Sequence, residues 1–464
     1  MNFNLPFRDK IFRFLGPTRM IALSFVLVIL VGSVLLWLPI AQNPGMRASY
    51  LNSLFVATSA TCVTGLMPFA VIDQYNLIGQ TVLIFLMQIG GLGLMSLLAL
   101  FLTLMRRKLN FSEKKMLQDS LNKNDADNIP NFLKSIFRYT FIFEGIGMGL
   151  LALRFIPEYG LAQGLYNSVF LSISAFCNAG LDNLTRSSLM AYTSDPLINF
   201  TVCGLIITGG LGFAVWFDLR RILPEKKKLS WKRLWTRLSL HSRLVLVVTG
   251  ILLGSGTLIV LLVEYGNPNT LGWMNFPQKI MAAFFQSTTL RTAGFSTIDF
   301  ALLKDASLFI MLFYMIIGGS PGGTAGGIKT TTFSMLFVLI ISEIRDSGNM
   351  TLFKRTLPSS TFHRAFAITL TYACIMVIAI FLLTLTEPQI GFLPLAFEAF
   401  SAIATVGLSA GVTPLLSALG KIVIIMLMYI GRVGPITIVL SLMRMKQNRK
   451  TNNLVYPHGD VLIG

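Results

Sequence analysis

The sequence has little charge for its length. Only 12% of its 464 residues are charged, whereas about a quarter of a soluble protein is. Its three histidines and four cysteines form no Cys-x-x-Cys pair and no His-Glu-x-x-His string, so neither a zinc site nor a catalytic set is indicated. The mean hydropathy of +0.69 requires most side chains to face lipid rather than water. We therefore expect a membrane protein that is not an enzyme.

Eight apolar stretches are long enough to cross a bilayer, which needs about 20 apolar residues. They are expected at residues 20–38, 78–104, 136–153, 197–217, 244–263, 308–340, 365–385 and 422–442. The first is interpreted as a retained helix, because no small-residue cleavage site follows it. The predicted fold class is an all-α membrane protein with eight transmembrane helices.

Positive charge is distributed unevenly between the connections. Of the 38 Lys and Arg residues, 29 fall within residues 1–19, 105–138, 218–243, 343–364 and 441–464, whereas the alternate connections carry seven. By the positive-inside rule the rich segments and both termini are cytoplasmic. The net charge of +18 follows from this bias, so membrane lipid or an acidic cytoplasmic partner is indicated, and no nucleic acid.

A fourfold repeat runs through the chain. Gly65, Gly180, Gly294 and Gly407 follow one another at intervals of 115, 114 and 113 residues. Each is preceded by a phenylalanine at ten residues and by a serine or threonine at six. These pairs are Phe55 and Ser59, Phe170 and Ser174, Phe284 and Thr288, and Phe397 and Ser401. A further glycine follows each one 24 to 29 residues later, at positions 90, 209, 318 and 431. Four repeats in one register are predicted.

Each repeat reads as a span, a segment of about ten residues, the glycine and a second span. Such a segment, for example residues 54–62, is too short to cross a bilayer and suits a re-entrant pore helix. The expected divisions are a cytoplasmic N-terminus at 1–19, repeats at 20–130, 131–240, 241–360 and 361–445, and a cytoplasmic tail at 446–464. Four re-entrant pore helices around one pseudo-symmetric pore are predicted.

The backbone ending at each repeat glycine is predicted to form a cation filter. Non-helical backbone at membrane depth must be buried or must line a water-filled path, and a ring of carbonyls can replace the water shell of an alkali cation. The predicted filter residues are Val63, Thr64, Gly65, Asn178, Ala179, Gly180, Thr292, Ala293, Gly294, Thr405, Val406 and Gly407. The alternative, glycines that only pack helices, leaves the shared phenylalanine and hydroxyl unexplained.

Residues 318–327 interrupt the sixth span with six glycines and a proline. The string is not a Walker loop, because Ile328 separates Gly327 from Lys329. Broken helices in transporters lie where substrate passes, so an intramembrane gate is predicted. It comprises Gly318, Gly319, Ser320, Pro321, Gly322, Gly323, Thr324, Ala325, Gly326 and Gly327. The alternative is a passive kink, which would need only one or two such residues.

Several charges stand inside the apolar spans, where they are costly. Arg432 is in register with glycines of the other repeats. It is predicted to hold the gate loop by contacts with the carbonyls of that loop and with Ser320, or to be a structural anchor. Arg291 and Glu398 are expected to pair behind the filter. Glu144 is a candidate cation or proton site, and Lys329 is given a lesser role near the gate.

These motifs resemble the Trk/Ktr/HKT superfamily of potassium transporters, most closely the KtrB type of bacterial membrane subunit. The resemblance rests on residues 61–66, 176–181, 291–295 and 404–408, with 88–93 and 431–435, and covers nearly the whole chain. It implies a single-chain pseudo-tetramer in the bacterial plasma membrane with one filter. Family members with serine at the first filter glycine tend to favour sodium, so Gly65 implies selectivity for the potassium ion. It further implies a homodimer and a separate nucleotide-binding regulatory ring of the KtrA type.

The predicted function is potassium uptake down the electrochemical gradient through a gated filter. Two alternatives are an ion-coupled carrier with alternating access and a less selective monovalent-cation (sodium) transporter. The repeats all start inside and are therefore parallel, which favours the channel-like interpretation over a carrier built from inverted repeats. Whether the sodium ion activates transport is left open by the sequence.

Overall fold

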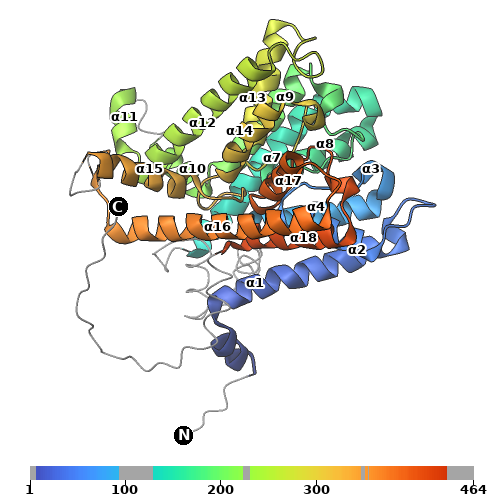
Figure 1. Ribbon diagram of the computed structural model, residues 1–464, viewed down its shortest axis with the longest axis horizontal. Coiled ribbons are helices and arrows are strands. Elements are labelled where there is room, and N and C mark those ends of the chain that lie inside the picture. Colours follow the sequence, from blue (N-terminus) through green and yellow to red (C-terminus); the bar gives the residue numbers. More distant parts are fainter. Residues whose placement is uncertain (1–6, 94–128, 223–229, 346–350, 354, 436–464) are drawn as a thin grey trace.

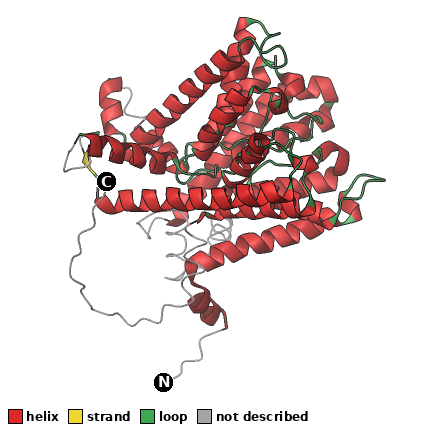
Figure 2. Ribbon diagram, in the orientation of Figure 1, coloured by secondary structure: helices red, strands yellow, loops and turns green. Residues whose placement is uncertain are grey.

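The computed structural model describes residues 7–93, 129–222, 230–345, 351–353 and 355–435. This part of the chain is helical apart from short 3₁₀ turns, loops and one antiparallel pair, β1 (Thr351–Leu352) with β2 (Arg355–Thr356) (Figure 2). The first repeat contains α1 (Phe7–Trp37), α2 (Tyr50–Cys62), α3 (Val71–Gln74) and α4 (Leu77–Leu92). The second contains α7 (Ile129–Tyr159), α8 (Leu161–Cys177), α9 (Pro196–Gly210) and α10 (Phe213–Ile222).

The second half of the chain repeats this order. After α11 (Trp231–Arg237), the third repeat contains α12 (Leu240–Glu264), α13 (Phe276–Thr289), α14 (Asp305–Ile316) and α15 (Thr330–Ile344). The fourth contains α16 (Ser359–Thr386), α17 (Phe392–Ile403) and α18 (Ala418–Val433). The short helices α2, α8 and α17 each pack against the helix before and the helix after them in their repeat, and α13 packs against the helix before it, α12. Each of the four also contacts a helix of a neighbouring repeat. These neighbour contacts, α2 with α18, α8 with α4, α13 with α9 and α17 with α14, close a ring (Figure 1).

The four short helices have 13, 17, 14 and 12 residues, somewhat more than the ten expected. Capping groups explain two of the early starts. Ser49 accepts a hydrogen bond from Asn52 N–H (3.3 Å) before α2, and Asn275 forms a capping box with Gln278 before α13. The outer faces of the long helices carry exposed apolar side chains such as Leu27, Phe85 and Val377, as a lipid-facing surface requires.

By length and composition, three of the described helices qualify as membrane spans, namely α7, α12 and α16. A fourth is the pair α9 and α10 if it is counted as one span. The pair is bent by 94°, so the stretch predicted as a span at 197–217 is divided between two helices. The bend occurs at Gly212, whose φ of +85° is a conformation that glycine adopts without the strain of a Cβ.

Four predicted spans correspond to the helices α1, α7, α12 and α16. Of the others, one more is divided and two run past the limits of the described chain. Residues 308–340 form two helices, α14 and α15, on either side of the glycine-rich string. The stretches 94–104 and 436–442 of two predicted spans, and most of the basic segments 105–138 and 441–464, lie outside the described residues. The number of spans therefore remains a prediction.

The second glycine of each repeat brings the helix after the pore helix into contact with main chain. A Cβ atom at Gly90, Gly209 or Gly431 would overlap the carbonyl oxygen four residues before the filter glycine. The carbonyls belong to Thr61, Phe176 and Ile403. In the third repeat Gly318 instead meets the carbonyl of Gly326. Helix packing at this distance excludes any side chain.

We expect Gly431→Ala to destabilise the protein by about 1–3 kcal/mol, because the added methyl group has no room beside the Ile403 carbonyl. The measurement is thermal unfolding of the purified protein in detergent. Gly250→Ala is the matched control, since an added Cβ there meets nothing within 4 Å. Equal unfolding temperatures for the two variants would contradict the packing role.

Candidate functional site

The four repeat glycines meet in a closed ring of main chain. A Cβ atom added to any of them would lie against a carbonyl oxygen of the neighbouring repeat. An added Cβ atom would lie 2.8 Å from Ala179 O at Gly65, 2.6 Å from Ala293 O at Gly180, and 2.8 Å from Val406 O at Gly294. Gly407 faces Thr64 O in the same way. The four predicted filter segments are thus brought together, with backbone facing backbone.

Their backbone conformation repeats as closely as their sequence. The residue two positions before each glycine is left-handed, with φ of 57° at Val63, 59° at Asn178, 63° at Thr292 and 52° at Thr405. The glycines themselves also have positive φ, between 67° and 104°. Left-handed β-branched residues are strained, and strain of this kind is found at functional sites that the surrounding structure over-determines.

Hydroxyl groups behind the ring stabilise three of the four segments. Ser59 and Ser401 accept hydrogen bonds from Gly65 N–H and Gly407 N–H, each at 3.0 Å. Ser174 accepts one from Leu181 N–H, also at 3.0 Å. In the third repeat the register differs. Thr288 bonds within its own helix, whereas Thr289 donates to the carbonyl of Phe295 (2.7 Å). Thr289 was not identified from the sequence, because the shared spacing pointed to the residue before it.

Polar side chains next to the ring lack protein partners. Among the described residues, the hydroxyls of Thr292 and Thr405 and both polar atoms of the Asn178 amide are buried without a hydrogen bond. Buried polar groups are nearly always paired, so orphaned ones need an explanation. Three such groups at one level, at positions equivalent by repeat, are suited to a path that contains water or cations.

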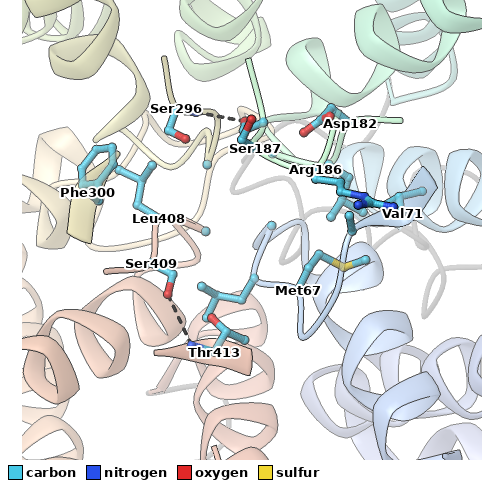
Figure 3. Close-up of a pocket in the computed structure, with 18 of the residues that line it drawn as sticks. Met67, Val71, Asp182, Arg186, Ser187, Ser296, Phe300, Leu408, Ser409 and Thr413 are labelled. Carbon is cyan, nitrogen blue, oxygen red and sulfur yellow. Dashed lines mark hydrogen bonds between the residues drawn. The ribbon is translucent and has the colours of Figure 1, made fainter. Parts of the chain in front are cut away.

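A hollow of about 310 Å³, the mouth, opens on one side of the ring. All four repeat glycines line it, and each repeat also contributes side chains (Figure 3). Those labelled in Figure 3 include Met67, Val71, Asp182, Arg186, Ser296, Phe300, Ser409 and Thr413. Arg186 is paired with Asp73 at 2.9 Å. Burial raises the pKa of Asp182 to about 6, and hydrogen bonds from the backbone of Thr185 and Leu184 partly oppose this.

On the other side of the ring lies the glycine-rich loop 318–327. Its two ends are joined, since Gly318 N–H donates to Ile328 O (2.9 Å) and Ile328 N–H donates to Ile316 O (3.0 Å). Gly326 lies so close to Thr405 that a Cβ atom there would overlap the threonine hydroxyl. The loop therefore lies directly against a filter residue.

The loop is held mainly by the second repeat. Ser320 N–H donates to Gly210 O (2.9 Å) and Thr324 N–H to Gly209 O (3.2 Å). The Thr324 hydroxyl donates to the carbonyl of Phe176 (3.1 Å), at the end of α8. This anchoring role of α9 was not predicted from the sequence. The only sequence signal for it is the adjacent pair Gly209 and Gly210, since residues without side chains leave their carbonyl oxygens accessible to a partner.

Arg432 joins the loop to the first repeat. Its guanidinium donates to the carbonyls of Thr324 and Gly90, and to Gly91 O at 3.4 Å. It therefore contacts the loop through a carbonyl, as expected. The expected contact with Ser320 is wrong, because that hydroxyl pairs with Thr330 (3.0 Å).

The remaining intramembrane charges are placed differently from the prediction. No ion pair joins Arg291 and Glu398, so the expected pairing is wrong. Glu398 is satisfied by the hydroxyls of Ser409 (2.8 Å) and Thr413 in its own repeat. The Nε and Nη2 atoms of Arg291 have no hydrogen-bond partner among the described residues.

Two further polar groups predicted near the site make local contacts. Lys329 donates to the carbonyl of Ala325 in the loop (2.6 Å). Glu144 on α7 accepts a long hydrogen bond from Gln88 on α4 (3.4 Å), which supplies the partner that the sequence did not identify. Its role as an ion or proton site remains a prediction.

Comparison with known proteins assigns the chain to a family. Residues 8–453 match the family described as TrkH, cation transport protein. The chain is 38% identical over 462 residues to the Ktr system potassium uptake protein B of Bacillus subtilis, covering 98% of this chain and 99% of that protein. It is 38% identical over 460 residues to the potassium/sodium uptake protein NtpJ of Enterococcus hirae, covering 98% of this chain and 99% of that protein. The crystal structure of the potassium transporter TrkH from Vibrio parahaemolyticus superposes with a TM-score of 0.70 at 18% identity, covering 91% of this chain and 85% of that one.

An all-helical, multi-pass membrane fold with a ring of backbone at its centre defines a membrane transport protein. The chain belongs to the TrkH/Ktr family of cation transporters. The expectations of this family, and of a transporter rather than an enzyme, are thereby confirmed.

We expect cation uptake to fall when the medium at the mouth is acidified through pH 6. With a pKa of about 6, Asp182 is ionised above that pH and attracts cations, and it is neutral below it. Loss of one charge from a narrow mouth should lower uptake at low cation concentration by roughly two- to tenfold. Flux at pH 7 and pH 5 in vesicles tests this. Asp182→Asn should remove the difference and Asp305→Asn should retain it, and an unchanged profile in Asp182→Asn would contradict the assignment.

Proposed function

We propose that this protein takes up potassium ions through a single pore whose filter is the ring of residues 63–65, 178–180, 292–294 and 405–407. The observation that carries the proposal is the closure of that ring, in which each glycine faces a carbonyl of the next repeat. Four carbonyl-bearing segments around one axis suit a dehydrated alkali cation. The names of the relatives, a potassium uptake protein and a potassium/sodium uptake protein, are in keeping with this cargo.

The proposed architecture has eight transmembrane helices and four re-entrant pore helices in a bacterial plasma membrane, with both termini cytoplasmic. The ring of contacts between α2, α8, α13 and α17 and their neighbours supports the fourfold arrangement. The asymmetry of Lys and Arg supports the orientation. With the cell interior negative, about 2.3 kcal/mol per charge per 100 mV drives uptake.

The loop 318–327 and Arg432 are proposed to form the gate. The loop lies against Thr405, and Arg432 binds it through Thr324. A fixed positive charge under the filter also opposes an approaching cation by about 4 kcal/mol at 4 Å, with an effective dielectric constant near 20. Movement of the loop away from the ring would open the path.

The proposed assembly is a homodimer with a cytoplasmic nucleotide-binding ring of the KtrA type. The support is the name of the relative, which assigns that protein to a Ktr system. Sodium is proposed as an activator. The support is again the name of a relative, the potassium/sodium uptake protein.

Replacement of one filter glycine should remove the preference for potassium. In Gly294→Ser the new Cβ lies 2.8 Å from Val406 O at a φ of +81°, so the ring must distort. We expect the ratio of potassium to sodium uptake into vesicles to fall at least about tenfold, equivalent to about 1.4 kcal/mol. Gly45→Ser is the matched control, because Gly45 has a φ of +84° and open space around it.

Rubidium uptake in the same vesicles should follow potassium in the wild type. Equal potassium and sodium fluxes that Gly294→Ser leaves unchanged would overturn the filter. That result would favour a less selective transporter or a carrier with alternating access.

Removal of the Arg432 charge should weaken the gate. Arg432→Gln loses charged hydrogen bonds to the carbonyls of Thr324 and Gly90, and one such bond contributes about 1.5–3 kcal/mol. We expect basal potassium flux to rise by about tenfold. Lys421→Gln, which removes a charge at the other end of α18, is the control. A lower or equal flux in a stably folded Arg432→Gln protein would contradict the gating role.

A further inference from the structure

A second hollow, of about 340 Å³, lies between α7 and α10. It is near the amino-terminal end of α7, on the side that the charge bias makes cytoplasmic. Its lining includes Arg138, Tyr139 and Phe143 of α7 and Trp216, Leu219 and Arg220 of α10. Neither the filter nor the gate accounts for a hollow that combines two guanidinium groups with aromatic rings.

The two arginines give the hollow its charge. Arg138 and Arg220 are both exposed at its rim, and the lining, as far as the chain is described, contains no carboxylate. Arg220 is oriented by Tyr139, whose hydroxyl accepts its hydrogen bond at 3.5 Å and whose ring centroid is 6.0 Å from the guanidinium carbon. The next residue, Arg221, is instead neutralised by Asp218 at 2.8 Å. Guanidinium groups bind the oxygens of a phosphate through parallel N–H donors, and this hollow has two of them in its lining.

The rest of the hollow suits a lipid. Phe143 and Trp216 form its floor, with ring centroids 4.8 Å apart. Ile142 also lines it, and exposed Ile142, Ile146 and Leu150 continue along the same face of α7 into the apolar region. The 94° bend after α9 turns α10 away from the direction of the span, as in helices that lie in the membrane interface with a basic polar face.

We propose that this hollow binds the phosphate headgroup of an anionic phospholipid and that its occupancy stabilises the gate loop in the arrangement seen here. The phosphate contacts Arg138 and Arg220, and the acyl chains follow the apolar face of α7. The regulatory part of this proposal rests on the proposed function of loop 318–327 as a gate.

Two short paths connect the hollow to that loop. At the start of α10, Phe213 N–H donates to Gly322 O (3.1 Å). In the floor, Phe143 stacks on Phe176 with centroids 6.0 Å apart, and the carbonyl of Phe176 accepts the Thr324 hydroxyl (3.1 Å). A ligand stabilises the arrangement that it fits best. Because the loop here lies against the filter, anionic lipid should lower uptake.

Binding is tested with the full chain in phosphatidylcholine vesicles that contain brominated phosphatidylglycerol, which quenches nearby tryptophan. Wild-type fluorescence should be quenched more strongly by brominated phosphatidylglycerol than by brominated phosphatidylcholine, and Trp216→Phe should remove the difference. At roughly fivefold per arginine, the preference for the anionic lipid should fall by about 25-fold in the Arg138→Gln, Arg220→Gln double variant. Arg364→Gln, an exposed arginine at the start of α16, should retain it. Equal quenching by the two lipids, or an unchanged preference in the double variant, would overturn the site.

Regulation is tested by potassium flux in the same vesicles. Phosphatidylglycerol should reduce wild-type flux severalfold and leave the double variant unaffected. Lipid binding without any effect on a measurable flux would overturn the link to the gate. Quenching does not require transport, so failure of the lipid site and failure of the proposed function give different results. If the double variant keeps its lipid preference but no longer binds a regulatory ring, the surface is a protein-docking site and the lipid proposal is wrong.

Discussion

The structure depends on the close approach of main chain to main chain at four glycines. Each repeat places the missing side chain of its glycine against a carbonyl of the next repeat, so a Cβ atom at any of the four positions would force the segments apart from the arrangement seen here. A second layer of the same kind lies behind, where Gly90, Gly209 and Gly431 press helices against the ends of the pore helices. Backbone packed in this way places carbonyl oxygens, rather than side chains, at the centre of the protein.

The third repeat departs from this symmetry, and the departure creates the loop 318–327 that we propose as the gate. Its second glycine, Gly318, packs against Gly326 of the loop rather than against α13. The helix that should continue from α14 is therefore replaced by a loop whose backbone groups must find other partners. The carbonyls of Gly209 and Gly210, the hydroxyl of Thr324 and the guanidinium of Arg432 supply them. The loop 318–327 is thus the segment of the third repeat that we propose to move beneath the filter.

Much of this arrangement could be predicted from the sequence, because the same close packing of main chain requires the same residue types in each repeat. The four glycines at nearly constant spacing, the hydroxyls of Ser59, Ser174 and Ser401 and the interruption at 318–327 all have the positions expected of them. The errors concern contacts that the repeat does not determine. The 94° bend after α9 brings Phe213 N–H into a hydrogen bond with the carbonyl of the distant Gly322, a contact that the local sequence does not indicate. Arg291 and Glu398 do not pair, because Glu398 has nearer hydroxyl partners in its own repeat.

The central claim is that the four carbonyl-bearing segments form one cation-binding ring. The most direct measurement is an experimental structure of the protein in rubidium or thallium salt, with the anomalous signal used to locate the cation. We expect anomalous density on the axis between the carbonyls of Thr64, Ala179, Ala293 and Val406, and loss of that density in Gly294→Ser. Density absent from this axis, or present at a site away from the four glycines, would contradict it.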